Sequence, residues 1–233
     1  MYELHIANKN YSSWSLRPWL LLSELGIPFE EKLESFAVGA GSSWHAFREF
    51  SPNGKVPCLR DGDTVVWDSL AITEYLAERH PGVWPSDPVA RAWARCASAE
   101  MHSGFGALRS QCTMNCGLRI RMPDNVSAAL HADIARIDEL WGEGLARFGG
   151  PFLAGKTFGA VDAFFAPVAF RIQTYGLTLV APAATYAKRL RELPAMRSWY
   201  DDALQEGWRD PEHEDEARQS GVLLEDLRVP EGR

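Results

Sequence analysis

The sequence predicts an α/β domain at residues 1–82, an all-α helical domain at 88–206 and a C-terminal tail at 207–233. Strand and helix signals alternate over the first eighty residues in the order β-α-β-α-β-β-α, which is typical of an α/β domain. The segment "VWPSDP" at 83–88 contains two prolines and marks a linker. After it, apolar residues recur at helical spacing, as at positions 130, 134, 137, 141 and 145.

The elements of the α/β domain follow from local patterns. A helix predicted at 15–26 ends at Gly26, with a proline just beyond, which is a stop signal. Residues 56–67 indicate two strands joined at Asp61-Gly62, a dipeptide typical of tight hairpins. The remaining predicted segments are strands at 2–7 and 29–35, a glycine-rich loop at 37–43, a short helix around 44–50 and a helix at 69–80.

The second half of the chain reads as helices. They are predicted at 88–111, 126–148 and 160–175, with one or two more in 183–206. The acidic segment "PEHEDEARQSG" that follows is expected to be a solvated surface segment.

Composition excludes several classes of protein. Hydrophobic residues make up 46 % of the chain, which supports a packed core, and the net charge of −7 does not favour nucleic acid. There is no secretory signal pattern and no apolar run near the roughly 18 residues of a membrane span. The four cysteines are too few for a disulfide framework, so we expect a soluble cytoplasmic protein, with Cys112 and Cys116 on a helix as buried free thiols and no metal site.

The stretch "NGKVPCL" at 53–59 precedes the predicted hairpin and admits two interpretations. One is a simple turn followed by an edge strand, where proline is tolerated. The other is a cis Val56–Pro57 bond that turns the Val56 backbone outward to pair with an extended ligand. The motif alone leaves both open.

The stretch "WDSLAI" at 67–72 places Asp68 and Ser69 at the start of a predicted helix. Both residue types cap helices, and a helix N-terminus with a hydroxyl group also binds carboxylates. Asp68 beside it is suited to an ammonium group. Together they predict a site for the amine and carboxylate of an amino acid.

These motifs, together with "SSWSLR" at 12–17 and the helical second half, resemble the cytosolic glutathione transferase family over about residues 2–206. The resemblance implies a thioredoxin-like domain that binds glutathione, a helical domain that binds a small electrophile, and a homodimer. It implies that Val56, next to Pro57, pairs with the cysteinyl backbone of glutathione. It also implies that Asp68 and Ser69 hold the γ-glutamyl end and that Lys55 reaches a carboxylate.

The serines at the start of the first helix resemble the "SSCSxR" pattern of zeta-class transferases, in which a serine donates a hydrogen bond to the glutathione sulfur. Aligned on Arg17, Ser12 takes the catalytic position and Ser13 is its neighbour. We favour Ser12 as the donor and keep Ser13 open, and we expect Ser15 to cap the helix. Arg17 is expected to order the loop or to pair across the domains.

The chain departs from this resemblance at two places. Trp14 stands where zeta-like relatives carry a cysteine, so mixed-disulfide chemistry is not expected. In the "GAVD" segment at 159–162, Gly159 takes the helix-cap position usually held by Ser or Thr, while Asp162 still serves the first turn.

The electrophile pocket is expected between the serine loop and the long helix. Its candidate residues are Trp14, Met101, Phe105, Leu108, Arg109 and Met114, of which Arg109 is suited to an anionic substrate group. We expect a glutathione transferase that attacks a small electrophile with a thiolate. The alternatives are a glutathione-dependent isomerase, resembling maleylacetoacetate isomerase, and a non-enzymatic glutathione- or ligand-binding protein.

Overall fold

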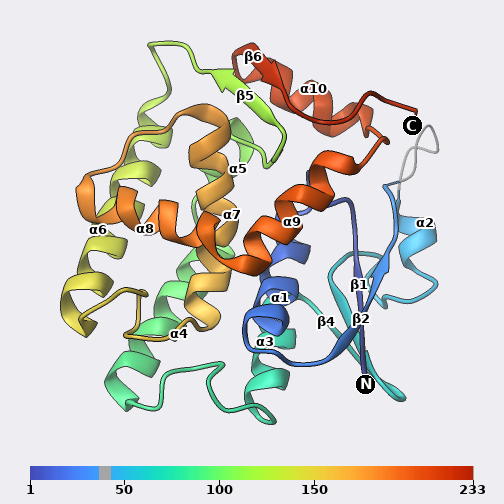
Figure 1. Cartoon of the computed structure of the whole chain (residues 1–233), viewed down its shortest axis with the longest axis vertical. Coiled ribbons are helices and arrows are strands. Elements are labelled where there is room, and N and C mark those ends of the chain that lie inside the picture. The colour runs from blue at the N-terminus through green and yellow to red at the C-terminus, as the bar shows by residue number, and fades with distance from the viewer. Residues whose placement is uncertain (37–42, 233) are drawn as a thin grey trace.

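The computed structural model describes residues 1–36 and 43–232, and most of the predicted glycine-rich loop at 37–43 lies outside them. The N-terminal part contains four strands and three helices in the predicted order (Figure 1). Their bounds are β1 Tyr2–Ile6, α1 Ser13–Glu24, β2 Phe29–Leu33, α2 Trp44–Phe47, β3 Cys58–Asp61, β4 Thr64–Trp67 and α3 Ser69–Ala77.

The four strands form one mixed sheet in the order β2-β1-β3-β4. β1 and β2 are parallel and connected through α1, whereas β1/β3 and β3/β4 are antiparallel. The β3–β4 turn contains Gly62 at φ 59°, as the Asp61-Gly62 signal predicted. Helices α1 and α3 contact each other and the sheet. This is a thioredoxin-like βαβαββα domain, so the predicted fold class is confirmed.

The cap of α1 differs from the prediction. Ser12, not Ser15, is the N-cap: its φ and ψ of −80° and 81° lie outside the helix, and its Oγ accepts a hydrogen bond from the Ser15 N–H. Ser15 is already helical and cannot fill that position. The helix begins two residues earlier than the apolar pattern indicated, because Ser13 and Trp14 form its first turn.

Helices dominate the rest of the chain, with bounds α4 Pro88–Ser103, α5 Gly106–Gln111, α6 Ala128–Phe148, α7 Ala160–Tyr175, α8 Ala181–Glu192, α9 Pro194–Gln205 and α10 Pro211–Gln219. α7 lies at the centre of the molecule, where it contacts α1, α4 and α8 (Figure 1). Most of its residues are buried on every side, as expected for a helix that is apolar all round. Gly159 and Asp162 cap it as predicted.

The single helix predicted at 88–111 is two helices. Gly104 ends α4, and Phe105 follows with a left-handed φ of 57° before α5 begins. The side chain of Arg109 donates hydrogen bonds to the Gly104, Met101 and His102 carbonyls at the end of α4. These contacts satisfy carbonyls that an uninterrupted helix would have used, so they stabilise the break.

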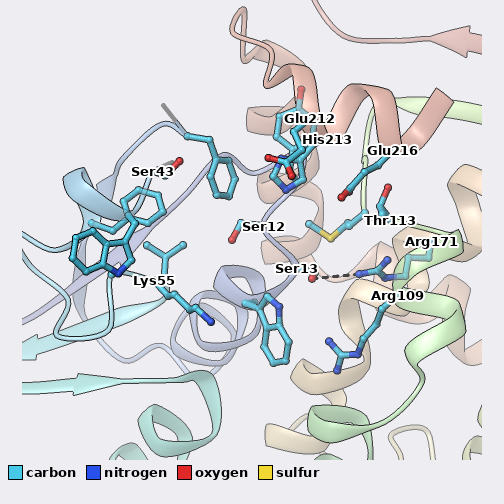
Figure 2. Close-up of a pocket in the computed structure, with 18 residues that line it drawn as sticks. Ser12, Ser13, Ser43, Lys55, Arg109, Thr113, Arg171, Glu212, His213 and Glu216 are labelled. Carbon is cyan, nitrogen blue, oxygen red and sulfur yellow. Dashed lines mark hydrogen bonds between the residues drawn. The ribbon is translucent and has the colours of Figure 1, made fainter. Parts of the chain in front are cut away.

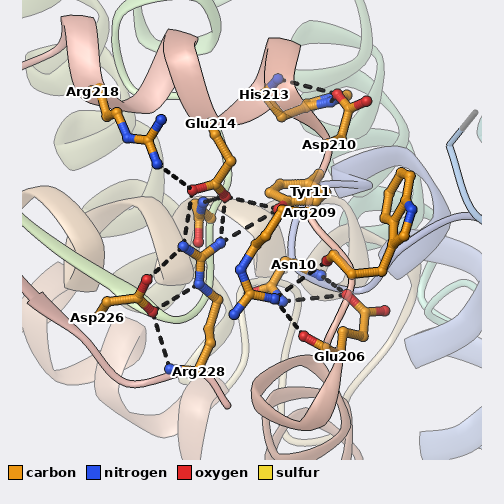
Figure 3. A network of polar contacts seen from close by, with 12 residues as sticks. Asn10, Tyr11, Glu206, Arg209, Asp210, His213, Glu214, Arg218, Asp226 and Arg228 are labelled. Carbon is orange, nitrogen blue, oxygen red and sulfur yellow. Dashed lines mark hydrogen bonds and ion pairs between the residues drawn. The ribbon is translucent and has the colours of Figure 1, made fainter. Parts of the chain in front are cut away.

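The acidic tail lies at the surface as expected, with most residues of 211–220 exposed, but it is ordered and anchored, which was not predicted. It forms α10 and strand β6 (Val222–Asp226), which pairs antiparallel with β5 (Leu118–Arg121). Glu214 of α10 is only 4 % exposed, and it forms an ion pair with Arg228, which is also buried. Figure 3 shows this pair at the centre of a polar network that includes Tyr11. The tail therefore packs on the molecule and adds a two-stranded sheet to the helical domain.

Two further findings concern the predictions about membrane spans and cysteines. Among residues 1–36 and 43–232, no helix is long and apolar enough to cross a membrane. All four cysteines are free: Cys58, Cys112 and Cys116 are buried and Cys96 is exposed. Cys112 ends α5 and Cys116 lies in the following loop. The prediction that both lie on one helix is therefore wrong.

Candidate active site

A cavity of about 630 Å³ opens where the start of α1 faces the helical domain and α10 (Figure 2). We call it the serine cavity, because Ser12 and Ser13 both line it. Its other lining residues are Tyr11, Trp14, Phe36, Ser43, Trp44, Phe47, Gly54, Lys55, Val56, Arg109, Thr113, Met114, Arg171, Glu212, His213 and Glu216.

The two serines have different hydrogen bonds. The Ser12 hydroxyl donates to Ser15 Oγ at 2.7 Å, and its oxygen caps α1, so its proton is already used inside the protein. Ser13 Oγ instead accepts a hydrogen bond from the Arg171 guanidinium at 3.3 Å. Among the described residues the Ser13 hydroxyl has no acceptor for its own proton. Ser13 is thus the serine whose proton is available to a group bound in the cavity.

Arg171 comes from α7 and is 5 % exposed. Its guanidinium also donates to the Cys112 carbonyl, and its Nε has no partner in the described part of the chain. Burial lowers the pKa of Arg171 to about 10, so the group remains a cation at neutral pH. Figure 2 shows it directed at Ser13. A hydroxyl that accepts from a cation is a stronger donor to a third group.

Two more arginines surround Trp14, so the neighbourhood of Ser13 is cationic. The Arg17 and Arg109 guanidinium carbons lie 4.2 and 4.6 Å from the Trp14 ring centroid. Arg17 is buried, and its pKa is lowered by that burial and by the charges of Arg109 and Arg171. None of the three arginines forms an ion pair with a carboxylate of the described residues. Arg17 also lies 4.9 Å from the Phe164 ring of α7, and so bridges the two domains.

The loop before β3 brings Lys55 and Val56 to the serine cavity. The Val56–Pro57 bond is cis, which agrees with the second of the two interpretations of this motif. Pro57 itself is buried behind Val56 and does not line the cavity.

Asp68 and Ser69 begin α3, as predicted, but neither lines the serine cavity. Asp68 has an unusual left-handed φ of 77°, and its Oδ1 accepts from the Leu70 N–H at 2.8 Å. A strained backbone at a non-glycine residue is common at ligand sites. Its Oδ2 lies 3.4 Å from His102 Nε2. Ser69 is buried, and its Oγ accepts from Arg17 at 3.4 Å; Arg17 in turn contacts Trp14, which lines the serine cavity.

Three of the residues expected in the electrophile pocket lie elsewhere. Met101, Phe105 and Leu108 are 2 %, 6 % and 0 % exposed and pack in the hydrophobic core, so they do not line the cavity. The break after α4 turns this stretch inward. Trp14 and Arg109 do line the cavity, although three carbonyls occupy much of the Arg109 guanidinium.

Several lining residues were not found from the sequence. Thr113 follows α5, and Glu212, His213 and Glu216 belong to α10, whereas Met114 was among the residues expected in the pocket. One signal for Arg171 was present, since it is the only Lys or Arg in the apolar segment 160–175. No such signal marked the α10 residues, because their acidic segment looked like solvated surface.

A thioredoxin-like domain joined to a helical domain, with serines at the start of α1 beside a cis-proline loop, defines a glutathione-transferase-like protein. Comparison with known families supports this assignment. The model of the glutathione S-transferase N-terminal domain matches residues 11–79, and that of the C-terminal domain matches 124–202. Because the two matches together span more than half of the chain, the chain belongs to the glutathione S-transferase family.

Individual relatives are distant. Glutathione S-transferase GstB of Escherichia coli K12 is 27% identical over 210 residues, which cover 81% of this chain and 93% of GstB. A probable maleylacetoacetate isomerase of Caenorhabditis elegans is 36% identical over 101 residues, covering 42% of this chain and 46% of that protein. Among solved structures, the theta class glutathione S-transferase of Xanthomonas axonopodis pv. citri, with glutathione bound, is 25% identical with a TM-score of 0.61. The match covers 85% of this chain and 96% of that one.

Proposed function

We propose that this chain is a glutathione transferase that binds glutathione in the serine cavity and activates its thiol for attack on a small electrophile. Ser13 supports this best: its hydroxyl is held by the Arg171 cation, lines the cavity and has a proton free for a ligand. A thiol with a pKa near 8.5 is mostly protonated at pH 7, so activation requires a donor that favours the thiolate.

The hydrogen bonds favour Ser13 over Ser12 as that donor, in contrast to the motif alignment. Lowering a thiol pKa by two units takes about 2.7 kcal/mol of preferential stabilisation. One hydrogen bond that involves an ion contributes about 1.5–3 kcal/mol. Ser13, polarised by Arg171, is suited to supply most of this, whereas Ser12 is occupied by Ser15.

The rest of glutathione is assigned by the family motifs. We propose that Val56 pairs with the cysteinyl backbone, that Lys55 holds a carboxylate and that Asp68 and Ser69 hold the γ-glutamyl end. The strained backbone of Asp68 and its place at the start of α3 are consistent with such a role. In this assignment residues 1–82 bind glutathione, and residues 88–206 with the tail shape the electrophile site.

The electrophile is proposed to be small, conjugated and acidic. Trp14, Phe36 and Met114 supply apolar surface to the serine cavity. Arg109 and Arg171 supply positive charge without a carboxylate partner, so an anionic group of the substrate is favoured beside them. A glutathione-dependent isomerase remains a second candidate, because part of the chain is similar to a probable maleylacetoacetate isomerase.

We further propose a cytoplasmic homodimer. A second hollow lies over β4 and α3 and is lined mainly by apolar residues, including Val65, Trp67 and Leu70. Trp67 is 43 % exposed in the single chain, which is unusual for so large an apolar side chain. The molar mass measured by light scattering tests this. We expect a dimer for wild type and a monomer for Trp67→Glu.

The activity is tested by following glutathione consumption and product mass with an aromatic chloride and with a cis-enone acid. A transferase consumes one glutathione per product and forms a thioether. An isomerase needs glutathione but leaves its concentration unchanged. Binding of glutathione with neither reaction contradicts an enzymatic function for these substrate classes.

A further inference from the structure

His213 lies in the first turn of α10, next to the helix cap Asp210. Asp210 Oδ2 accepts hydrogen bonds from the His213 backbone N–H at 3.1 Å and from its ring Nδ1 at 2.5 Å. Because an ionised carboxylate only accepts, Nδ1 carries a proton, and in the neutral ring Nε2 then carries the lone pair. The pair therefore has the arrangement that orients a histidine as a base.

The imidazole is held against the serine loop by two aromatic rings. It stacks on Tyr11 with a centroid distance of 5.0 Å, and it lies 4.8 Å from the Phe36 ring. Tyr11 directly precedes Ser12, and His213 lines the same cavity as Ser12 and Ser13. Figure 2 shows the ring pointing into the serine cavity toward Ser12. In the described part of the chain, Nε2 has no hydrogen-bond partner.

α10 itself is anchored, so this placement does not depend on His213. Glu214, the next residue, accepts hydrogen bonds from Tyr11 and Arg228 on the buried side of the helix. The family match ends at residue 202, so the family models do not account for α10.

We propose that His213 is the proton acceptor for the glutathione thiol in the serine cavity. This inference rests on the proposed function. The S–H bond breaks with both electrons left on sulfur, and the proton moves to His213 Nε2. The resulting imidazolium keeps its Nδ1–H directed at Asp210, whose charge stabilises it. Thiolate and imidazolium then form an ion pair of the kind found in cysteine–histidine sites.

The fate of the proton depends on the electrophile. In an addition to a conjugated double bond, the sulfur forms a bond to carbon and the imidazolium returns its proton to the carbanion. In a substitution, the sulfur forms a bond to carbon, the leaving group departs with its electron pair and the imidazolium loses its proton to water.

Other titratable groups near His213 are less suited to this role. Tyr11 donates its proton to Glu214, and its pKa is raised by burial and by that carboxylate, so it stays neutral. Glu214 is held by Arg228 (Figure 3) and does not line the cavity. The remaining charged groups of the described residues that line the cavity or belong to or contact α10 are Lys55, Arg109, Arg171, Glu212, Asp215, Glu216, Arg218 and Arg228. Of these only Glu212 and Glu216 are carboxylates that line the cavity, so they are the alternative acceptors.

The test compares protons released with thiolates formed when glutathione binds at pH 7.5. Calorimetry in buffers of different ionisation enthalpy gives the number of protons released per glutathione bound. Ultraviolet absorbance gives the amount of thiolate formed. The variants are His213→Asn, Glu212→Gln and Glu216→Gln, with His131→Asn on the exposed surface of α6 as control. Asp210→Asn keeps the helix cap, since Asn caps as well as Asp, but removes the charge at Nδ1.

For wild type and His131→Asn we expect fewer than about 0.3 protons released per thiolate, because the imidazole retains the proton. For His213→Asn we expect about one proton per thiolate, because the proton then goes to solvent. Asp210→Asn should give an intermediate ratio and serves as the test if His213→Asn does not fold.

Two results would overturn the proposal: an unchanged ratio in His213→Asn, or a change confined to Glu212→Gln or Glu216→Gln. If wild type binds glutathione without any thiolate absorbance, the proposed function fails instead, and the two failures are thus distinguished.

Discussion

The hydroxyl of Tyr11 donates a 2.7 Å hydrogen bond to Glu214, 203 positions later in the chain. The same carboxylate accepts from Asn115 at 3.2 Å and forms a buried ion pair with Arg228 (Figure 3). Tyr11 precedes the two serines, so this network connects the C-terminal tail to the serine loop. The tail thereby becomes part of the site.

Arg228→Met should destabilise the protein strongly, because it leaves the Glu214 carboxylate buried without its cation. Breaking a buried ion pair in this way typically lowers the free energy of unfolding by about 3–5 kcal/mol. Chemical denaturation of wild type and variant at pH 7 measures this difference. The double variant Glu214→Gln/Arg228→Met removes both charges and should recover much of that loss. If the double variant is as unstable as the single one, the ion pair does not hold the tail.

The same pair predicts an effect of acid. Burial by itself would raise the pKa of Glu214, but hydrogen bonds from Arg228, Tyr11 and Asn115 hold it below its usual value. A carboxyl with a lowered folded pKa stabilises the protein above its unfolded pKa, and that stabilisation is lost as the pH falls below about 4. Protease cleavage near residue 207 should therefore increase below this pH in wild type. Glu214→Gln should be cleaved at a rate that changes little with pH.

Asp162 should have the opposite dependence. Burial raises the pKa of its carboxyl to about 6, although Tyr186 and two backbone N–H groups donate to it. Because the folded state binds this proton more tightly than the unfolded state, stability falls as the pH rises from about 4 through 6, by about 3 kcal/mol. The stability difference between wild type and Asp162→Asn should shrink by that amount. Asp201→Asn, on the exposed side of α9, should show no such change.

Cysteine reactivity should follow burial. Burial raises the pKa of Cys112 to about 12 and also raises the pKa values of Cys116 and Cys58. Only the exposed Cys96 should react with Ellman's reagent in the native protein at pH 8, and all four should react in denaturant. Cys96→Ser should remove the fast reaction with Ellman's reagent that the native protein shows. A second fast thiol would contradict this arrangement.

The charge preference of the electrophile site is tested with 4-chloro-3-nitrobenzoate and its neutral amide. If the benzoate binds beside Arg109, Arg109→Gln should lower kcat/KM for it about tenfold, equivalent to about 1.4 kcal/mol. The amide serves as the control, and its kcat/KM should fall less than about twofold in Arg109→Gln. This smaller loss reports only the structural role of Arg109 at the end of α4. Equal losses would place the anionic group elsewhere.

Much of the fold was readable from local signals. The order of elements, the hairpin at Asp61-Gly62 and the cap at Gly159 depend on residues adjacent in sequence, and all are present. The helix break at Gly104 was not predicted, because the apolar spacing continues across it and the stabilising contacts come from Arg109. α10 was not predicted, because its acidic composition conceals the buried Glu214, whose partner Arg228 lies 14 residues further along.

The site was predicted only where motifs are local. Lys55 and Val56 lie at the cavity, as the proline motif indicated. The choice between Ser12 and Ser13 depends on a hydrogen bond from Arg171, 158 residues away, and such a pairing has no signal in a single sequence. The assignment of Ser12 as helix cap likewise required its backbone angles.

The most direct test of the central claim is the ultraviolet thiolate absorbance of bound glutathione, titrated between pH 5 and 9. The hydrogen bonds of the two serines predict that, in wild type, the pKa of the bound thiol is about two units below that of the free thiol. In Ser12→Thr, which keeps the helix cap, the pKa of the bound thiol should be close to its wild-type value. In Ser13→Ala the titration should return toward that of free glutathione. A lowered pKa that persists in Ser13→Ala, or none in wild type, would contradict activation by Ser13 and Arg171.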